Sequence, residues 1–190
     1  MTERYTDKSS EDQLILVDEN DQEIGSALKK DCHLGNGILH RAFSVFIFNE
    51  ENEVLMQQRS EEKMLWGKFW SNACCSHPKL GETIEDAAQR RIKEELSIEA
   101  DLNFLFKFEY QEKFEDIGSE NELCHVLIGK CAEKPNVDPN EISDWKYLSI
   151  EELTLSIKEN PNQYTPWLKI EWSKIMGSQF KEVKRFLDLK

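Results

Sequence analysis

A thiol, an imidazole and an ion pair occur close together in residues 71–96, which read SNACCSHPKLGETIEDAAQRRIKEEL. Cys75 and His77 lie two residues apart, ahead of a predicted helix. Arg91 and Glu95 fall on the same arc of that helix as its apolar residues. One segment therefore brings a thiol, a metal-competent nitrogen, a cation and a carboxylate to one neighbourhood. An isolated Arg–Glu pair at this spacing more often covers the edge of a core. The rest of the chain is therefore needed to distinguish a structural ion pair from a functional one.

Imidazoles and carboxylates elsewhere in the chain could complete a metal site. Three of the four histidines lie in or beside predicted loops or strand ends, while the fourth, His125, falls mid-strand and is expected to be structural. Two glutamates lie two residues apart and would share one face of a strand. Three nitrogens with carboxylate oxygens suit a divalent metal of intermediate hardness. Each histidine taken alone is more often simply hydrogen-bonded, and none belongs to a tight zinc motif. The set is His33, His40, His77, Glu120 and Glu122.

Other reactive or charged residues also have a plain structural alternative. Cys75 could be a small buried hydrophobe, and its neighbour Cys74 is expected to be inert. Four cations fall around the same loops, although solvated surface charge is the default for such residues. Trp66, Trp70 and Trp167 supply aromatic surface, for which core packing is the default. The four cations are Lys29, Arg59, Lys63 and Arg91.

The composition indicates one domain, residues 1–190, in a reducing compartment. The chain is 39% apolar, and its five cysteines lack any framework spacing. No apolar run reaches membrane-spanning length and the start is too acidic for a transit peptide, so we expect a cytoplasmic protein without a membrane partner. The sequence does not determine the oligomeric state, and a monomer is favoured. A net charge of -13 without a basic stripe argues against a nucleic-acid partner. Residues 1–13 are polar, which predicts either a disordered segment or an arm that closes over the site.

The hydrophobic pattern predicts an α/β domain with a mixed sheet and helices on both sides. The first two strands should form a hairpin and the next two a second one. Thr83 is the expected N-cap of the central helix, with Asp86 completing a capping box. Strands are expected at residues 14–17, 23–27, 42–48, 54–59, 102–110, 122–130 and 144–148, helices at 84–96, 150–158 and 167–187, and loops at 29–39 and 60–69.

Five runs, in order along residues 29–167, resemble those of one enzyme family. They are LHRAFSVFIF, QQRSEEKMLWGKFWSNACCSHP, RRIKEEL, SENELCHV and YTPW. The sequence resembles the type I isopentenyl-diphosphate isomerases of the Nudix superfamily, and its CSHP and ENE segments are specific for them. The resemblance implies a Nudix-like α/β/α sandwich. It also implies an enzyme of isoprenoid precursor synthesis that converts isopentenyl diphosphate to dimethylallyl diphosphate, by protonation and deprotonation through a tertiary carbocation.

The resemblance also implies roles for individual residues. Cys75 and Glu122 would be the acid/base pair. Glu95, with the backbone carbonyl of Cys75, would hold Mg²⁺ that arrives with the diphosphate. Trp167 would face the isoprenoid, and Tyr110 would lie near Glu122. The implied ligands of one further divalent metal (Mg²⁺, Mn²⁺ or Zn²⁺) are His33, His40, His77, Glu120 and Glu122, and the implied diphosphate-binding cations are Lys29, Arg59, Lys63 and Arg91.

The hydrolase signature of the same superfamily, Gx5Ex7REUxEExGU with U apolar, is only partly present. The chain keeps Glu82 and Arg90 but has Arg91 where that signature has a glutamate that helps to hold water-activating metals. A cation there argues against nucleoside-diphosphate hydrolysis. Two alternatives stay open: a Nudix hydrolase of a diphosphate-linked substrate, suggested by Glu82, Glu94 and Glu95, and a non-catalytic, metal-stabilised binding module.

Overall fold

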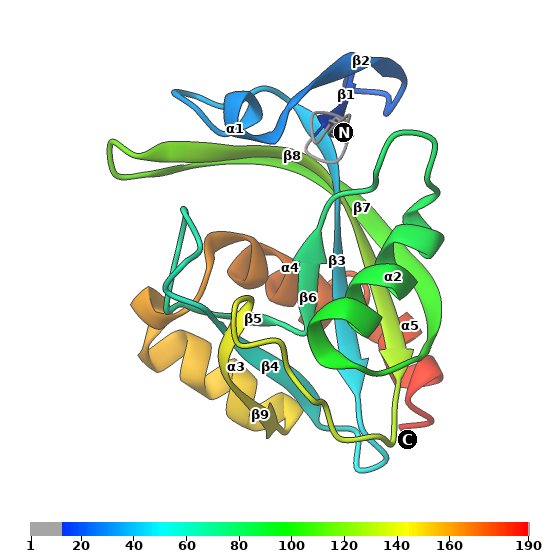
Figure 1. Ribbon diagram of the computed structural model, residues 1–190. Coiled ribbons are helices and arrows are strands. Elements are labelled where there is room, and N and C mark those ends of the chain that lie inside the picture. Colours follow the sequence, from blue (N-terminus) through cyan, green and yellow to red (C-terminus); the bar gives the residue numbers. More distant parts are fainter. Residues whose placement is uncertain (1–12, 190) are drawn as a thin grey trace, which may run out of the picture.

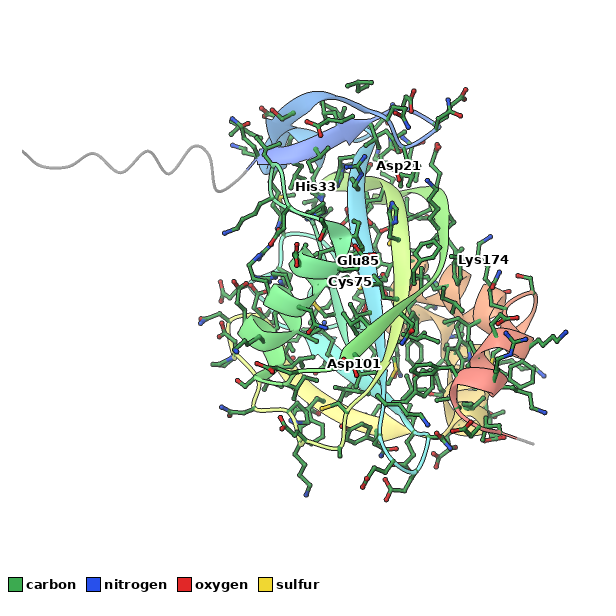
Figure 2. All side chains as sticks on the ribbon, turned by 90° about the vertical axis from the view of Figure 1, so that its right-hand side faces the viewer. Asp21, His33, Cys75, Glu85, Asp101 and Lys174 are labelled. Atoms are coloured by element: carbon green, nitrogen blue, oxygen red, sulfur yellow. The ribbon has the colours of Figure 1, made fainter. Side chains whose placement is uncertain are left out.

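The computed structural model describes residues 13–189, which form a nine-stranded mixed sheet with helices on both faces. Figures 1 and 2 show α2 against one face and α4 and α5 against the other. The predicted α/β architecture is therefore confirmed. The expectation for residues 1–13 falls outside the described part of the chain, except that Gln13 begins the first strand. Within residues 13–189, no helix has both the length and the hydropathy of a bilayer-spanning segment.

The elements follow one another along the chain as strands at the start, a central helix, two long strands and a helical end (Figure 1). The strands are β1 Gln13–Val17, β2 Glu23–Leu28, β3 His40–Phe48, β4 Val54–Arg59, β5 Trp70–Asn72, β6 Cys74–Ser76, β7 Asp101–Phe114, β8 Gly118–Lys130 and β9 Ile142–Leu148. The helices are α1 Lys29–Cys32, α2 Ile84–Leu96, α3 Ile150–Glu159, α4 Pro166–Met176 and α5 Phe180–Phe186, with a 3-10 turn at Pro161–Gln163.

Strand β3 lies at the centre of the sheet and sets the positions of its neighbours. It pairs in parallel with β8, which places His40 beside Glu122. It pairs in antiparallel register with β6, which places Ser44 beside Cys75. On its other side β8 pairs with β7, and this pairing puts Tyr110 beside Glu122. Side chains from four strands are thereby brought to one end of the sheet.

The sheet separates two apolar cores, because successive residues of β3 point to opposite faces. Phe43 and Val45 pack with α2 on one face, whereas Phe46 and Phe48 pack with α3, α4 and α5 on the other. These four side chains are fully buried. Burial of such a side chain contributes roughly 1.5–3 kcal/mol, so β3 is held firmly from both sides.

Helix α2 begins where the sequence predicts. Thr83 Oγ1 accepts a hydrogen bond from the backbone N–H of Asp86 at 3.1 Å and donates one to the Asp86 carboxylate at 2.8 Å. The N-cap is therefore confirmed, although the Asp86 side chain bonds to the cap hydroxyl rather than to its backbone. The helix ends at Leu96, and the cap residue Ser97 adopts the left-handed conformation with φ +54°.

Two local expectations are wrong. Residues 29–39 are not all loop, because they begin with α1, a helix too short to show an apolar period. Residues 167–187 are not one helix, because Gly177 takes a non-helical conformation (φ -105°, ψ -103°) between α4 and α5. The second predicted hairpin is present but short: β3 and β4 pair in antiparallel register at Phe48 and Val54, and β4 then continues against β5 and β9.

The N-cap gives the first prediction. Replacing Thr83 with alanine should lower the free energy of unfolding by about 1 kcal/mol, because the Asp86 N–H loses its acceptor. Urea denaturation followed by circular dichroism measures the change. Ser173→Ala, an exposed position in α4, serves as the control and should cost nothing. An unchanged midpoint in Thr83→Ala would show that the cap does not stabilise the helix.

Candidate active site

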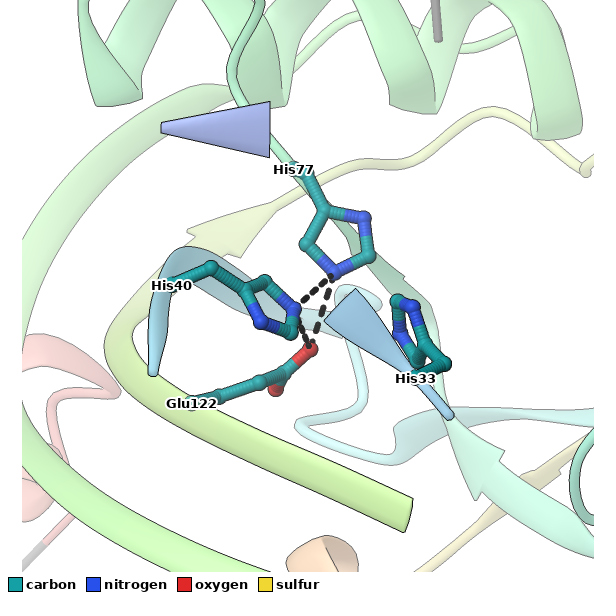
Figure 3. A group of neighbouring side chains, drawn as sticks. All are labelled: His33, His40, His77 and Glu122. Atoms are coloured by element: carbon teal, nitrogen blue, oxygen red, sulfur yellow. Dashed lines mark hydrogen bonds and ion pairs between the residues drawn. The ribbon is translucent and has the colours of Figure 1, made fainter. Parts of the chain in front are cut away.

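Three imidazoles and a carboxylate converge where β3, β6 and β8 meet the segment after α1 (Figure 3). One ligand atom from each of His33, His40, His77 and Glu122 lies within 4.8 Å of the others. The Nε2 atoms of His40 and His77 are 3.1 Å apart. Oε1 of Glu122 lies 2.9 Å from His77 Nε2 and 3.6 Å from His40 Nε2. The four side chains therefore form a compact group of nitrogen and oxygen ligands.

The hydrogen bonds behind this group turn the Nε2 atoms of two of its rings inward. His33 Nδ1 lies 2.7 Å from the carbonyl of Lys29, and His40 Nδ1 lies 2.7 Å from that of Ile38. A carbonyl only accepts, so Nδ1 of each ring carries a proton and its Nε2 turns toward the group. His33 Nε2 lies 2.9 Å from Oε2 of Glu120, a further buried carboxylate beside the group. This donor set fits a divalent cation.

Glu122 is ionised in this setting. Burial alone would raise its pKa, but the imidazoles of His40 and His77 outweigh that effect and hold the pKa well below its ordinary value. Burial also lowers the pKa of His77 to about 3. Tyr110 donates a hydrogen bond to Oε2 of Glu122 at 2.6 Å. The carboxylate is thus charged, oriented and able to accept a proton.

The backbone holds His33 in place through the start of β8. The His33 carbonyl accepts a hydrogen bond from the Ser119 N–H at 2.9 Å, and the Ser119 hydroxyl donates to Gly35 O at 2.7 Å. Gly118 lies so close that an added Cβ would sit 2.4 Å from the His33 carbonyl oxygen. Only a residue without a side chain fits there.

Cys75 and Glu122 both line a cavity of about 250 Å³. The Cys75 thiol donates to Asn72 Oδ1 at 2.9 Å and lies 3.4 Å from Ser44 Oγ and 3.8 Å from Ser71 Oγ. Burial raises the pKa of this thiol to about 12. It is therefore a proton carrier at neutral pH rather than a ready thiolate nucleophile.

Asn72 fixes the direction of the Cys75 thiol. Its amide nitrogen donates to the carbonyls of Val45 and Cys74, both at 3.1 Å, which turns its oxygen toward Cys75. The sequence offers no motif around Asn72, and its role depends on strand register. Cys74 points to the opposite side and is fully buried in the core beneath α2, in agreement with its expected inertness.

The four expected cations line the same cavity. Arg59 donates to the carbonyls of Leu65 and Trp66 at 3.0 and 3.2 Å. Lys63 pairs with Glu141, whose other oxygen lies 3.1 Å from Arg91. Positive charge is thereby concentrated at one mouth of an acidic protein, which favours a small anionic ligand. The set consists of Lys29, Arg59, Lys63 and Arg91.

The ion pair expected on α2 is present. Arg91 Nη2 contacts Glu95, which is 2% exposed. Glu82 is bound by Arg90 through two bonds of 2.7 Å. Glu94 is exposed and also pairs with Arg90. The carboxylates suggested for a hydrolase are thus engaged by arginine, and neither Glu82 nor Glu94 lines the cavity.

Two expected site residues also lie outside the lining of the cavity. They are Glu95 and the fully buried His40.

Trp167 and Tyr110 form the apolar side of the cavity. Trp167 donates from Nε1 to Ser71 Oγ at 3.0 Å and meets the ring of Trp66 edge to face at 5.4 Å. The Arg59 guanidinium lies 5.1 Å from the centre of the Trp167 ring. His125 stays apart from the cavity and pairs with Asp21 at 2.8 Å, in agreement with a structural role.

Comparisons with known proteins agree with this geometry. A NUDIX domain model matches residues 38–168. Isopentenyl-diphosphate Delta-isomerase 1 of Photorhabdus laumondii is 44% identical over 90% of this chain and 98% of its own. The isopentenyl-diphosphate Delta-isomerase of Pectobacterium atrosepticum is 40% identical over 86% of this chain and 90% of its own. The fold is shared with a solved MutT NUDIX hydrolase from Burkholderia pseudomallei. That structure is 16% identical and has a TM-score of 0.58, and the match covers 72% of this chain and 98% of its own.

The inward Nε2 atoms predict stabilisation by metal. A divalent cation added to chelator-treated protein should raise Tm, and about 2.7 kcal/mol is expected at a free concentration 100 times Kd. Differential scanning calorimetry with Mg²⁺, Mn²⁺ and Zn²⁺ measures this. His40→Asn should abolish the response, whereas the control His125→Asn should retain it. A response that survives in His40→Asn would place the metal elsewhere.

Proposed function

The chain belongs to the isopentenyl-diphosphate Delta-isomerase family of NUDIX-domain proteins, and on that premise we propose that it converts isopentenyl diphosphate to dimethylallyl diphosphate with Cys75 and Glu122 as its acid/base pair. The observation that carries the proposal is their common cavity. A protonated thiol and an ionised carboxylate reach it from different strands, β6 and β8. One can therefore give a proton to the substrate while the other removes one.

The reaction makes strict demands on the acid. A carbon–carbon double bond is a very poor base, so the proton donor must be held against it and water must be excluded. In the direction written, the terminal methylene carbon gains the Cys75 proton and a tertiary cation forms. The methylene on its other side then loses a proton to Glu122, and the double bond moves. Burial keeps Cys75 protonated, whereas the imidazoles beside Glu122 keep that carboxyl ionised.

Aromatic side chains support the cationic stage. An indole face can contribute roughly 2 kcal/mol or more to a desolvated cation, and Trp167 presents its ring to the cavity. The ring already lies within cation–π distance of the Arg59 guanidinium. The hydrogen bond from Tyr110 orients the Glu122 carboxylate.

Two metal positions follow from the ligand chemistry. A divalent cation (Mg²⁺, Mn²⁺ or Zn²⁺) held by the histidine and glutamate group would supply the positive charge that keeps Glu122 ionised and oriented. Glu95 and the Cys75 carbonyl would hold the Mg²⁺ that accompanies the diphosphate. The first group consists of His33, His40, His77, Glu120 and Glu122.

The cations at the mouth anchor the diphosphate. Charge-assisted hydrogen bonds to phosphate oxygens are strong, and arginine makes them in pairs. Binding energy from this remote end positions the double bond between acid and base. The proposed anchors are Lys29, Arg59, Lys63 and Arg91.

We also propose that the chain acts on this small molecule as a cytoplasmic monomer in isoprenoid precursor synthesis, without a nucleic-acid or membrane partner. Its five cysteines are free thiols, which supports a reducing compartment. Its net charge of -13 disfavours phosphate backbones as partners.

Removal of the acid or the base tests the assignment. Cys75→Ala and Glu122→Gln should each lower kcat by about 100- to 10,000-fold, because the proton donor or acceptor is lost. Product is followed by NMR after incubation with isopentenyl diphosphate and Mg²⁺, and circular dichroism checks folding. Cys131→Ala, distant from the cavity, should remain active. Full activity in Cys75→Ala or Glu122→Gln would overturn the assignment, and release of phosphate without isomerisation would favour the hydrolase alternative.

The indole ring gives a separate prediction. Trp167→Leu should lower kcat by about 30-fold, the equivalent of roughly 2 kcal/mol, with a smaller change in KM. Trp167→Phe keeps an aromatic face and should lose less. Steady-state kinetics, normalised to the folded fraction, measure kcat of both variants. Equal kcat values for Trp167→Leu and Trp167→Phe would contradict the proposal.

A further inference from the structure

A carboxyl group lies in the apolar core behind Cys75. Glu171 is one helical turn beyond Trp167 in α4, between the buried side chains of Leu168 and Trp172, and is 0% exposed. Its Oε1 accepts a long hydrogen bond from the Cys124 thiol at 3.7 Å. Its Oε2 is buried and has no hydrogen-bond partner among residues 13–189. No lysine, arginine or histidine of that part of the chain forms an ion pair with it.

A carboxyl group in such surroundings is stable only as the neutral acid. An unpaired charge in an apolar interior is costly, so the group takes up a proton instead. Burial raises the pKa of Glu171 to about 8, and the negative charge of Glu122 acts in the same direction. The ionisable groups that face it are Cys124 and Glu122 from β8 and Cys75 from β6. At neutral pH Glu171 therefore carries a proton that it can donate.

The Ser44 hydroxyl connects this acid to the Cys75 thiol. Ser44 Oγ lies 3.4 Å from Cys75 Sγ and 3.5 Å from Cys124 Sγ. Ser44 is close enough to the Glu171 carboxyl to lower its pKa, and both groups contact the Cys124 thiol. Ser44 is 1% exposed, so the chain from Glu171 through Ser44 to Cys75 runs inside the protein. A hydroxyl has one proton, and its neighbours decide which of them receives it.

We propose that Glu171 is a positioning residue that directs the Ser44 hydroxyl toward the sulfur of Cys75. As a neutral acid, Glu171 donates to Ser44 Oγ, and Ser44 in turn donates to the sulfur. As a carboxylate, Glu171 only accepts, so the Ser44 proton turns toward it and the sulfur loses its donor. The only bond that breaks in this change is the O–H bond of Glu171, whose proton passes to solvent as the pH rises.

This arrangement matters for the proposed isomerisation, on which the inference rests. When Cys75 gives its proton to the substrate, negative charge develops on the sulfur. A donor already aimed at the place where charge appears lowers the barrier, and a second donor behind it strengthens the first. A Glu171 carboxylate would instead remove the donor and add a like charge.

Three substitutions separate this role from a packing role. Glu171→Gln keeps a donor of nearly the same shape but cannot ionise, whereas Glu171→Met keeps the volume and removes the donor. Glu159→Gln, at an exposed position in α3, is the matched control. The quantity measured is kcat at saturating substrate and Mg²⁺ across neutral and alkaline pH. Burial also lowers the pKa of Lys63 to about 8. Loss of the Lys63 charge would alter KM, so saturating substrate keeps this effect out of the measured kcat.

The unsubstituted chain should lose kcat with a midpoint near pH 8. Glu171→Gln should keep kcat within about threefold at neutral pH and lack this alkaline loss. Glu171→Met should be about tenfold slower at neutral pH, with KM unchanged. An alkaline loss that persists in Glu171→Gln, or a fully active Glu171→Met, would overturn the inference.

Infrared difference spectroscopy tests the same inference without turnover. Between neutral and alkaline pH, the unsubstituted protein should lose a carboxylic-acid band and shift the S–H band of Cys75. Glu171→Gln should show neither change, and Glu159→Gln should show both. Absence of both changes from the unsubstituted protein would overturn the inference. Their presence in a chain that makes no dimethylallyl diphosphate would instead count against the proposed function alone.

Discussion

The pairing of β3 with β8 on one edge and with β6 on the other is the constraint on which the site depends. It places His40 beside Glu122 and Ser44 beside Cys75. Strand side chains alternate between faces, so a slip of one residue in either ladder would turn one partner into the opposite core. The apolar residues of β3 are buried on both faces, and they resist that slip. Packing of the core thus sets the geometry of the chemistry.

The same burial has opposite effects on two groups that face one cavity. It raises the pKa of Cys75 because the nearby hydroxyls and the Arg59 cation do not offset it, whereas imidazoles beside Glu122 reverse its effect on that carboxyl. Environment, rather than residue type, therefore separates an acid from a base. Four cations line the cavity of a chain whose net charge is -13, and a few focused cations are sufficient to attract an anion.

Features set by local spacing could be predicted from the sequence. The period of two in a strand puts Glu120 and Glu122 on one face, and both line the cavity. The cap at Thr83 depends only on residues three apart. Features set by long-range register could not be predicted. Asn72 and Glu171 belong to no motif. The Asn72 amide is oriented by the carbonyl of Val45, 27 residues away, and Glu171 acts on Cys75 only because α4 packs against the sheet. The break at Gly177 likewise depends on how the last two helices pack.

The contact between Gly118 and the carbonyl of His33 has a consequence for how sequence variants of this protein are judged. A substitution at that codon would displace one imidazole from the centre while every ligand, acid and base kept its identity. A comparison limited to the motif residues would score such an allele as intact. The residue most easily overlooked in a genetic survey is thus the one with no side chain.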